Sequence, residues 1–183
     1  RGFGQKTHPA RPAPVDGGSC RGSRRDRLHE LRNSVNQYSS PSLSLIHRCR
    51  AVPYDRDQLN SLILRGLPHC LEIAKKHHAE LASLPGIEIT VLGARAMAKV
   101  HRDFLGIPGP TDVITFPYGE ILVCAPVAAE RAREFGHDTT TELALYAIHG
   151  LLHLSGHDDI TPAQEKRMAT AQEKILAAVL TIS

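Results

Sequence analysis

The sequence lacks long apolar runs and paired cysteines, and each absence argues against a class of protein. No apolar run approaches the roughly 20 residues that a membrane-spanning helix needs, so we expect a soluble protein with no membrane partner. No C-x-x-C pair occurs among the four cysteines, which are Cys20, Cys49, Cys70 and Cys124. This argues against a zinc ribbon and a disulfide framework, and it agrees with a reducing compartment, which we expect to be the cytoplasm.

The excess of positive charge is confined to the N-terminal part of the chain. Residues 1–50 contain ten Lys and Arg against three Asp and Glu, whereas residues 51–183 contain twelve against sixteen. Residues 1–46 are rich in Gly, Pro, Ser and Arg, so we predict a disordered basic extension without the apolar segment of a secretory signal. Three interpretations are open: an arm that attracts RNA, a passive solvated extension, or upstream sequence translated from a mis-assigned start.

Residues 47–183 have the patterns of one α+β domain. Strands are predicted at 47–52, 87–92, 112–116 and 121–124, the last two joined as a hairpin around residues 117–119. Helices are predicted at 55–84 with a break near 66–68, at 94–104, at 125–135, and in two segments that begin with the capping-box patterns Thr139-x-x-Glu142 and Thr161-x-x-Gln164. We expect a small mixed β-sheet packed with helices, and a metal site at the C-terminal end of the buried helix that contains His149.

The metal site is predicted from residues 149–159. His149 and His153 are four residues apart, so on a helix they lie on one face and can bind one ion. Gly156 can adopt the left-handed conformation that ends a helix and returns the chain toward them. Asp159 is the favoured third ligand because it lies ten residues after His149, the offset of the third ligand in HExxHxxGxxH metalloenzymes. His157 is the alternative.

Histidines in the core of an apolar helix are the alternative to a metal site. The helix around His149 is apolar on nearly every face, which predicts that it is buried. Each buried imidazole needs a polar partner to offset its desolvation, and a shared metal ion provides one for both.

The residue after the first histidine is Gly150, whereas zinc peptidases have a glutamate there as general base. Peptide hydrolysis by that mechanism would therefore lack its base. Water would have to be activated mainly by the metal ion, which suffices for attack on a phosphodiester.

These motifs resemble those of the YbeY-type metal-dependent endoribonucleases of rRNA maturation, whose signature is roughly H-G-x-L-H-L-x-G-Y-D-H. The matching positions are His149, Gly150, Leu152, His153, Leu154, Gly156 and Asp158. Residues 111–117 resemble the family's T-D-V-[LI]-[ST]-F-P strand, and residues 119–123 resemble the G-D-I strand that follows it. The resemblance covers about residues 47–183 and implies one zinc ion, an RNA substrate and the small ribosomal subunit as a partner.

Two departures from the family pattern bear on the site. The family's third ligand is usually histidine, whereas Asp159 matches that position; two histidines with one carboxylate also suit iron or manganese. The arginine implicated in the family's activity matches Leu105, and Arg102, one helical turn away, is a candidate to replace it. A basic groove for RNA would need dispersed residues, among them Arg95, Lys99, Arg102, Arg131 and Arg133.

The sequence therefore predicts a metal-dependent, single-strand-specific endoribonuclease in ribosomal RNA processing, where the resemblance implies maturation of the 3′ end of small-subunit rRNA and ribosome quality control. We expect His149, His153 and Asp159 to hold zinc, with a metal-bound water as the attacking group. One alternative is a metallopeptidase or other metallohydrolase, because the ligand offset fits that architecture. Another is a catalytically decayed, ribosome-associated RNA-binding factor, because Leu105 replaces the arginine.

Overall fold

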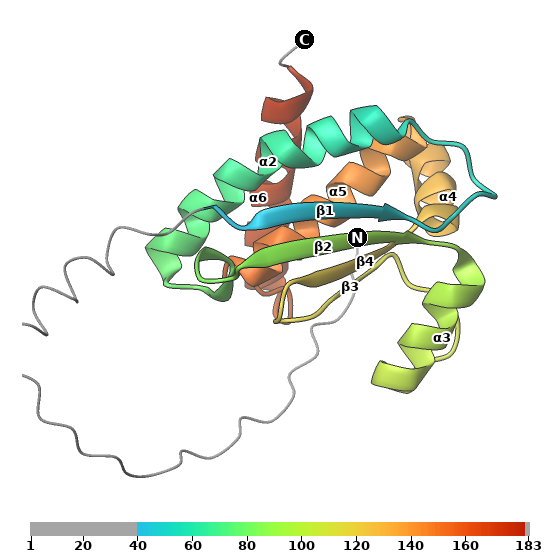
Figure 1. Cartoon of the computed structure of the whole chain (residues 1–183), viewed down its shortest axis with the longest axis horizontal. Helices are drawn as coiled ribbons and strands as arrows, with labels where there is room; N and C mark the ends of the chain where they lie inside the picture. Colours follow the sequence, from blue (N-terminus) through green and yellow to red (C-terminus); the bar gives the residue numbers. More distant parts are fainter. Residues whose placement is uncertain (1–39, 182–183) are drawn as a thin grey trace, which may run out of the picture.

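Four strands form one mixed sheet in the computed structural model, which describes residues 40–181 (Figure 1). β1 (Ser42–His47), β2 (Gly86–Leu92) and β4 (Glu120–Cys124) are parallel, and β3 (Val113–Thr115) pairs antiparallel with β4. The strand order is β1-β2-β4-β3, so β3 is an edge strand. The small mixed sheet and the hairpin of its last two strands are confirmed.

Five α-helices and one short 3-10 helix accompany the sheet in the described residues. They are α2 (Arg56–His77), the 3-10 helix η1 (Glu80–Ala82), α3 (Ala94–Leu105), α4 (Ala125–Phe135), α5 (Thr139–Leu154) and α6 (Pro162–Leu180). None of these helices has the length and apolar content needed to cross a bilayer. Together with the sheet they confirm the α+β class.

The two faces of the sheet pack against different helices because successive side chains of a strand point to opposite faces. Val113 and Ile121 lie in the larger apolar cluster, together with side chains of α2, α5 and α6. Ile114 and Leu122 lie in a smaller cluster with Met97 of α3. The helix α3 therefore lies on the face opposite α5, and Figure 1 shows it set apart from the other helices.

The first strand lies five residues earlier than the predicted range 47–52. In β1, Leu43 and Leu45 pack against the larger apolar cluster, whereas Ser42 and Ser44 are exposed, an alternation typical of a half-buried strand. Residues 48–55 instead connect β1 to α2. The sheet thus begins inside the range 1–46 that was predicted as an extension, and residues 1–39 of that range lie outside the described part of the chain.

The break predicted near residues 66–68 is absent, because α2 continues through Pro68. A proline lacks the N–H that would bond to the carbonyl four residues earlier, which here belongs to Leu64. Both Leu64 and Pro68 are exposed, so water can reach that carbonyl. Eight buried residues of α2 anchor the helix in the core, and this packing offsets the lost hydrogen bond.

The capping prediction is wrong for α5 and confirmed for α6. Asp138, not Thr139, is the N-cap of α5, and its carboxylate accepts a hydrogen bond of 2.9 Å from the Thr141 N–H. Glu142 lies 2.8 Å from His137 Nε2. In α6, Thr161 and Gln164 form the reciprocal hydrogen bonds of a capping box.

Candidate metal centre

The helix α5 carries both candidate histidines through the centre of the molecule. Every residue from Thr140 to Leu154 is buried, because apolar side chains occupy nearly all of its faces. The sheet lies on one side of α5, and α2 and α6 lie on others. Packing on all sides fixes the backbone of His149 and His153, so their imidazoles have little freedom to move.

The turn after α5 brings the third candidate ligand back toward the helix. Gly156 has a φ of 89°, in the left-handed region that favours glycine. The His157 N–H donates to the Leu152 carbonyl and the Gly156 N–H donates to the His153 carbonyl, each at 3.0 Å, which is the Schellman arrangement of a helix end. The chain reverses here, as predicted for Gly156.

Three candidate ligand atoms lie together where the chain returns. One atom each from His149, His153 and Asp159 lies within 4.8 Å of the other two. Asp159 Oδ2 is 3.7 Å from His149 Nε2, and Asp159 Oδ1 is 3.9 Å from His153 Nε2. These separations are longer than hydrogen bonds and leave room for an ion among the three atoms.

The other ring nitrogen of each histidine is oriented by a hydrogen-bond acceptor. His149 Nδ1 is 3.0 Å from Gln172 Oε1, and His153 Nδ1 is 3.0 Å from the His157 carbonyl oxygen. Because both partners accept, each Nδ1 carries the proton and each Nε2 presents its lone pair to the cluster. Partners of this kind fix ligand histidines in metalloproteins. Gln172, on α6, was not predicted from the sequence.

The protonation states also suit a cation. Burial lowers the pKa of His149 to about 3, and His153 acts in the same direction, so His149 is neutral near neutral pH. The contact of His149 with Asp159 is therefore not an ion pair. Burial is also the largest cause of the raised pKa of Asp159, and the neighbouring Asp158 raises it further. Two imidazoles, of which that of His149 is neutral, and a half-buried carboxylate form a donor set that a divalent cation would stabilise.

His157, the alternative third ligand, points elsewhere. Its ring stacks on the ring of His77, with 5.6 Å between the centroids. Its contribution to the cluster is its backbone carbonyl, which accepts from His153. Asp159 is the carboxylate that the structure brings to the two histidines.

Gly150 lies where α5 approaches the sheet most closely. A Cβ atom at this position would lie 2.7 Å from Ile121 Cγ2 and 2.9 Å from Thr115 Oγ1. Real Cβ atoms essentially never approach other atoms to under 3.0 Å, so a larger residue would displace α5 or these neighbours. The position that holds a glutamate in zinc peptidases therefore has no space for a side chain here.

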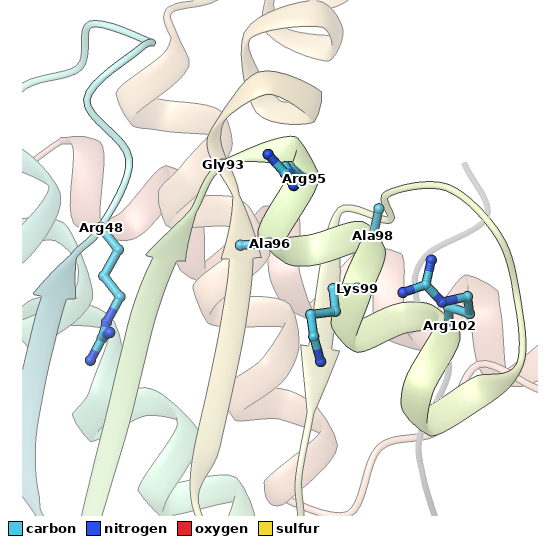
Figure 2. Close-up of a pocket in the computed structure, with 7 residues that line it drawn as sticks. All are labelled: Arg48, Gly93, Arg95, Ala96, Ala98, Lys99 and Arg102. Carbon is cyan, nitrogen blue, oxygen red and sulfur yellow. The ribbon is translucent and has the colours of Figure 1, made fainter.

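Arg102 and Leu105 do not join the three candidate ligands. Arg102 is exposed on α3, with its Nε 3.6 Å from Asp103 Oδ1. It lines a separate cavity together with Arg48, Arg95 and Lys99 (Figure 2). Leu105, the last residue of α3, is half-buried.

The fold and the site define a class: α+β proteins in which a buried helix and the turn after it present two imidazoles and a carboxylate as a candidate metal centre. Within this class, residues 52–180 match the family model described as Endoribonuclease YbeY, and the chain belongs to that family.

Curated relatives with the name Endoribonuclease YbeY include proteins of Micrococcus luteus and Mycobacterium tuberculosis. The first is 35% identical over 108 residues, which are 50% of this chain and 69% of the relative. The second is 37% identical over 109 residues, which are 49% of this chain and 62% of the relative. The chain also resembles a protein from Thermotoga maritima solved in solution, with a TM-score of 0.47, 29% identity, and coverage of 75% of this chain and 88% of that one.

Proposed function

We propose that this chain is a metal-dependent, single-strand-specific endoribonuclease of ribosomal RNA processing, with zinc held by His149, His153 and Asp159. Its substrate would be the RNA of the small ribosomal subunit, in the cytoplasm. The observation that carries the proposal is the cluster of three ligand atoms at the end of α5. Membership of the Endoribonuclease YbeY family, and the names of the curated relatives, support RNA as the substrate.

The chain's own groups have separate tasks at this site. Gln172 and the His157 carbonyl hold the protons of the two imidazoles on Nδ1, so that both Nε2 atoms can donate electron pairs. Asp159 adds negative charge and keeps 14% of its side chain exposed, which leaves the site open to solvent on its side. A divalent cation bound there would supply the Lewis-acid charge that activates water near neutral pH.

The metallopeptidase alternative is not favoured. Its general base would have to occupy the position of Gly150, where Ile121 and Thr115 leave no room for a Cβ atom. No other carboxylate in the described residues joins the three-residue cluster. A bound metal ion can itself activate water, so the lack of a protein base at residue 150 is compatible with attack on a phosphodiester.

The test is the metal content of the intact chain, measured by elemental mass spectrometry, beside its cleavage of labelled single-stranded and duplex RNA. We expect about one zinc per chain and cleavage of the single strand only. Asp159→Ala should weaken metal binding, and His149→Ala should abolish cleavage. His69→Ala is the matched control, because His69 is an exposed histidine of α2 outside the cluster.

The outcomes separate the alternatives. Cleavage that persists in His149→Ala would contradict the proposed site. RNA binding without cleavage, in protein that holds its metal, would instead favour a ribosome-associated factor whose catalysis has decayed. A chain that binds iron or manganese in place of zinc, and still cleaves, would change the metal and keep the site.

A further inference from the structure

The helix α3 buries few of its residues. Of its twelve residues, only Met97 and His101 are buried, whereas α5 is buried along nearly its whole length. His101 Nδ1 donates a hydrogen bond of 2.8 Å to the Gly109 carbonyl, because a carbonyl oxygen can only accept. That bond ties the loop after α3 to the helix. Six residues of α3 remain exposed and available to a partner, namely Arg95, Ala96, Lys99, Arg102, Asp103 and Phe104.

Three cationic side chains follow one another along the exposed side of α3. Arg95, Lys99 and Arg102 are spaced by four and three residues, which places them in one row on a helix. At 1.5 Å per residue the row is about 10 Å long. Arg48 joins them from the end of β1, and the four line a cavity of about 740 Å³ (Figure 2). We call these four residues the α3 cationic strip.

The strip keeps an excess of positive charge. Asp103 Oδ2 lies 2.5 Å from Lys99 Nζ, and Asp103 Oδ1 lies 3.6 Å from Arg102 Nε. One carboxylate is therefore shared by two of the four cations. Arg48 and Arg95 form no salt bridge with any residue of the range 40–181. Their charges remain available to an anionic partner, although residues 51–183 as a whole contain more acidic than basic residues.

An aromatic ladder lies at the C-terminal end of α3. Phe104 follows the buried Met97 by seven residues and shares its side of the helix, so the ladder lies on the opposite side of α3 from the cationic strip. The rings of Phe104 and Phe116 meet edge to face at 5.2 Å, and those of Phe116 and Tyr118 stack at 5.3 Å. Phe116 is only 5% exposed, whereas Phe104 is 62% and Tyr118 is 63% exposed. Two large rings are therefore held by a buried third ring while their own surfaces face solvent.

We propose that the α3 cationic strip and the aromatic ladder together bind single-stranded RNA. The cations hold phosphates on one side of α3, the strand passes over the C-terminal end of the helix, and unpaired bases stack on Phe104 and Tyr118. Proteins that bind single strands combine these two features, because the charges attract the backbone and any base can stack on a ring. The inference rests on the proposed function for the kind of nucleic acid, and it adds a binding surface away from the candidate metal centre.

The edge strand β3 connects this surface to the candidate metal centre. Thr115 faces α5 and lies beside Gly150. Gly150 is the residue that follows His149 in the sequence. Phe116 follows Thr115 and belongs to the cluster on the α3 face. Because β3 is the edge of the sheet, an RNA strand that passes around it can contact both faces. The α3 surface would hold one part of the strand while another part reaches the candidate metal centre.

The test is the binding of a fluorescein-labelled 12-nucleotide single-stranded RNA to the full chain, followed by anisotropy at several salt concentrations with EDTA present. Each phosphate contact contributes about 0.7 to the slope of log affinity against log salt for a single strand. Arg48→Gln/Arg95→Gln should lower the magnitude of this slope by about 1.4. Lys75→Gln/Lys76→Gln, which removes two exposed lysines of α2, should leave the slope unchanged.

Loss of an aromatic contact should lower the affinity for RNA without changing its salt dependence. Phe104→Ala should weaken binding roughly fivefold or more, which corresponds to the loss of one stacked base, without changing the salt slope. Phe135→Ala is the matched control, because Phe135 is a partly exposed phenylalanine on α4. A duplex of the same sequence should bind Phe104→Ala and the unchanged protein equally.

Either of two results would overturn the inference. One is that Arg48→Gln/Arg95→Gln and Phe104→Ala both bind the single-stranded RNA with the same affinity and salt slope as their control variants. The other is an equal loss in the α2 and α3 double variants, which would indicate attraction by net charge alone. Because EDTA prevents metal-dependent cleavage, a failure of the proposed catalytic function leaves these binding results unchanged, and the two failures can be distinguished.

Discussion

The helices α5 and α3 lie on opposite faces of one sheet and differ in where their functional groups point. Fifteen of the sixteen residues of α5 are buried, whereas α3 buries two of twelve. The polar side chains of α5 are therefore held in place by the core. Those of α3, except His101, face solvent, where a partner can reach them. The difference predicts that changes to α5 alter folding and metal affinity together, while changes to α3 alter binding alone.

The largest difference in stability should come from replacing one glycine of each helix, Gly150 in α5 and Gly93 at the N-cap of α3, by glutamate. Gly150→Glu forces a Cβ into Ile121 and Thr115 and buries a carboxylate, so we expect the free energy of unfolding to fall by roughly 3 kcal/mol or more. In Gly93→Glu, the new Cβ atom meets only Cys49 Sγ, at 4.0 Å. This change should alter the free energy of unfolding by less than about 0.5 kcal/mol. Urea unfolding measures both variants.

Equal stability of the two glutamate variants would contradict the close approach of α5 to the sheet. A folded Gly150→Glu protein would carry a glutamate at the position that it has in the zinc-peptidase motif. Peptidase activity of that protein would therefore show that a side chain at residue 150 fits between α5 and the sheet.

A smaller effect is expected at Gln172, which acts on the candidate metal centre through His149. Gln172→Ala removes the acceptor that holds the His149 Nδ1 proton, so zinc affinity should fall about 10- to 100-fold. Glu173→Ala, an exposed neighbour on α6, should leave the affinity unchanged. A competition titration against a chromophoric chelator measures both. Unchanged affinity in Gln172→Ala would show that packing alone orients the imidazole.

The contrast between α5 and α3 also explains which parts of the site could be predicted from the sequence. His149, His153, Gly156 and Asp159 lie within eleven residues, so helix geometry and one turn suffice to bring them together. Gln172 is 23 residues from its partner and was missed. Its signal was a polar residue among buried ones: α6 buries Met168, Gln172, Ile175 and Val179, which follow a helical spacing.

The surface on α3 could be predicted only in part, because it combines three segments. Arg95, Lys99 and Arg102 were named from the sequence among dispersed cations, and the helix predicted at 94–104, which contains all three, is confirmed as α3. Arg48 joins them only through the pairing of β1 with β2, and the first strand was predicted too late in the sequence to place it. The ladder requires contact between α3 and the β3–β4 turn, which local patterns do not indicate.

The smallest contrast concerns how the two helices begin. Asp138 caps α5, and hydrogen bonds from Thr141 and Thr140 outweigh its burial and lower its pKa. In contrast, Gly93 gives α3 no side-chain cap. Asp138→Ala should reduce the free energy of unfolding by about 1 kcal/mol at pH 7, and Gly93→Asp should raise it by a few tenths.

The pH dependence of the Asp138→Ala effect identifies its cause. A carboxyl group whose folded pKa lies below its unfolded value, about 3.9, stabilises the fold above that value and loses this contribution as the pH falls through the folded pKa. The difference between the two proteins should therefore be constant from pH 7 to about pH 5 and shrink below about pH 4. Urea unfolding at each pH measures it. A difference that persists undiminished below the folded pKa would mean that Asp138 stabilises α5 by packing rather than as a charged hydrogen-bond acceptor.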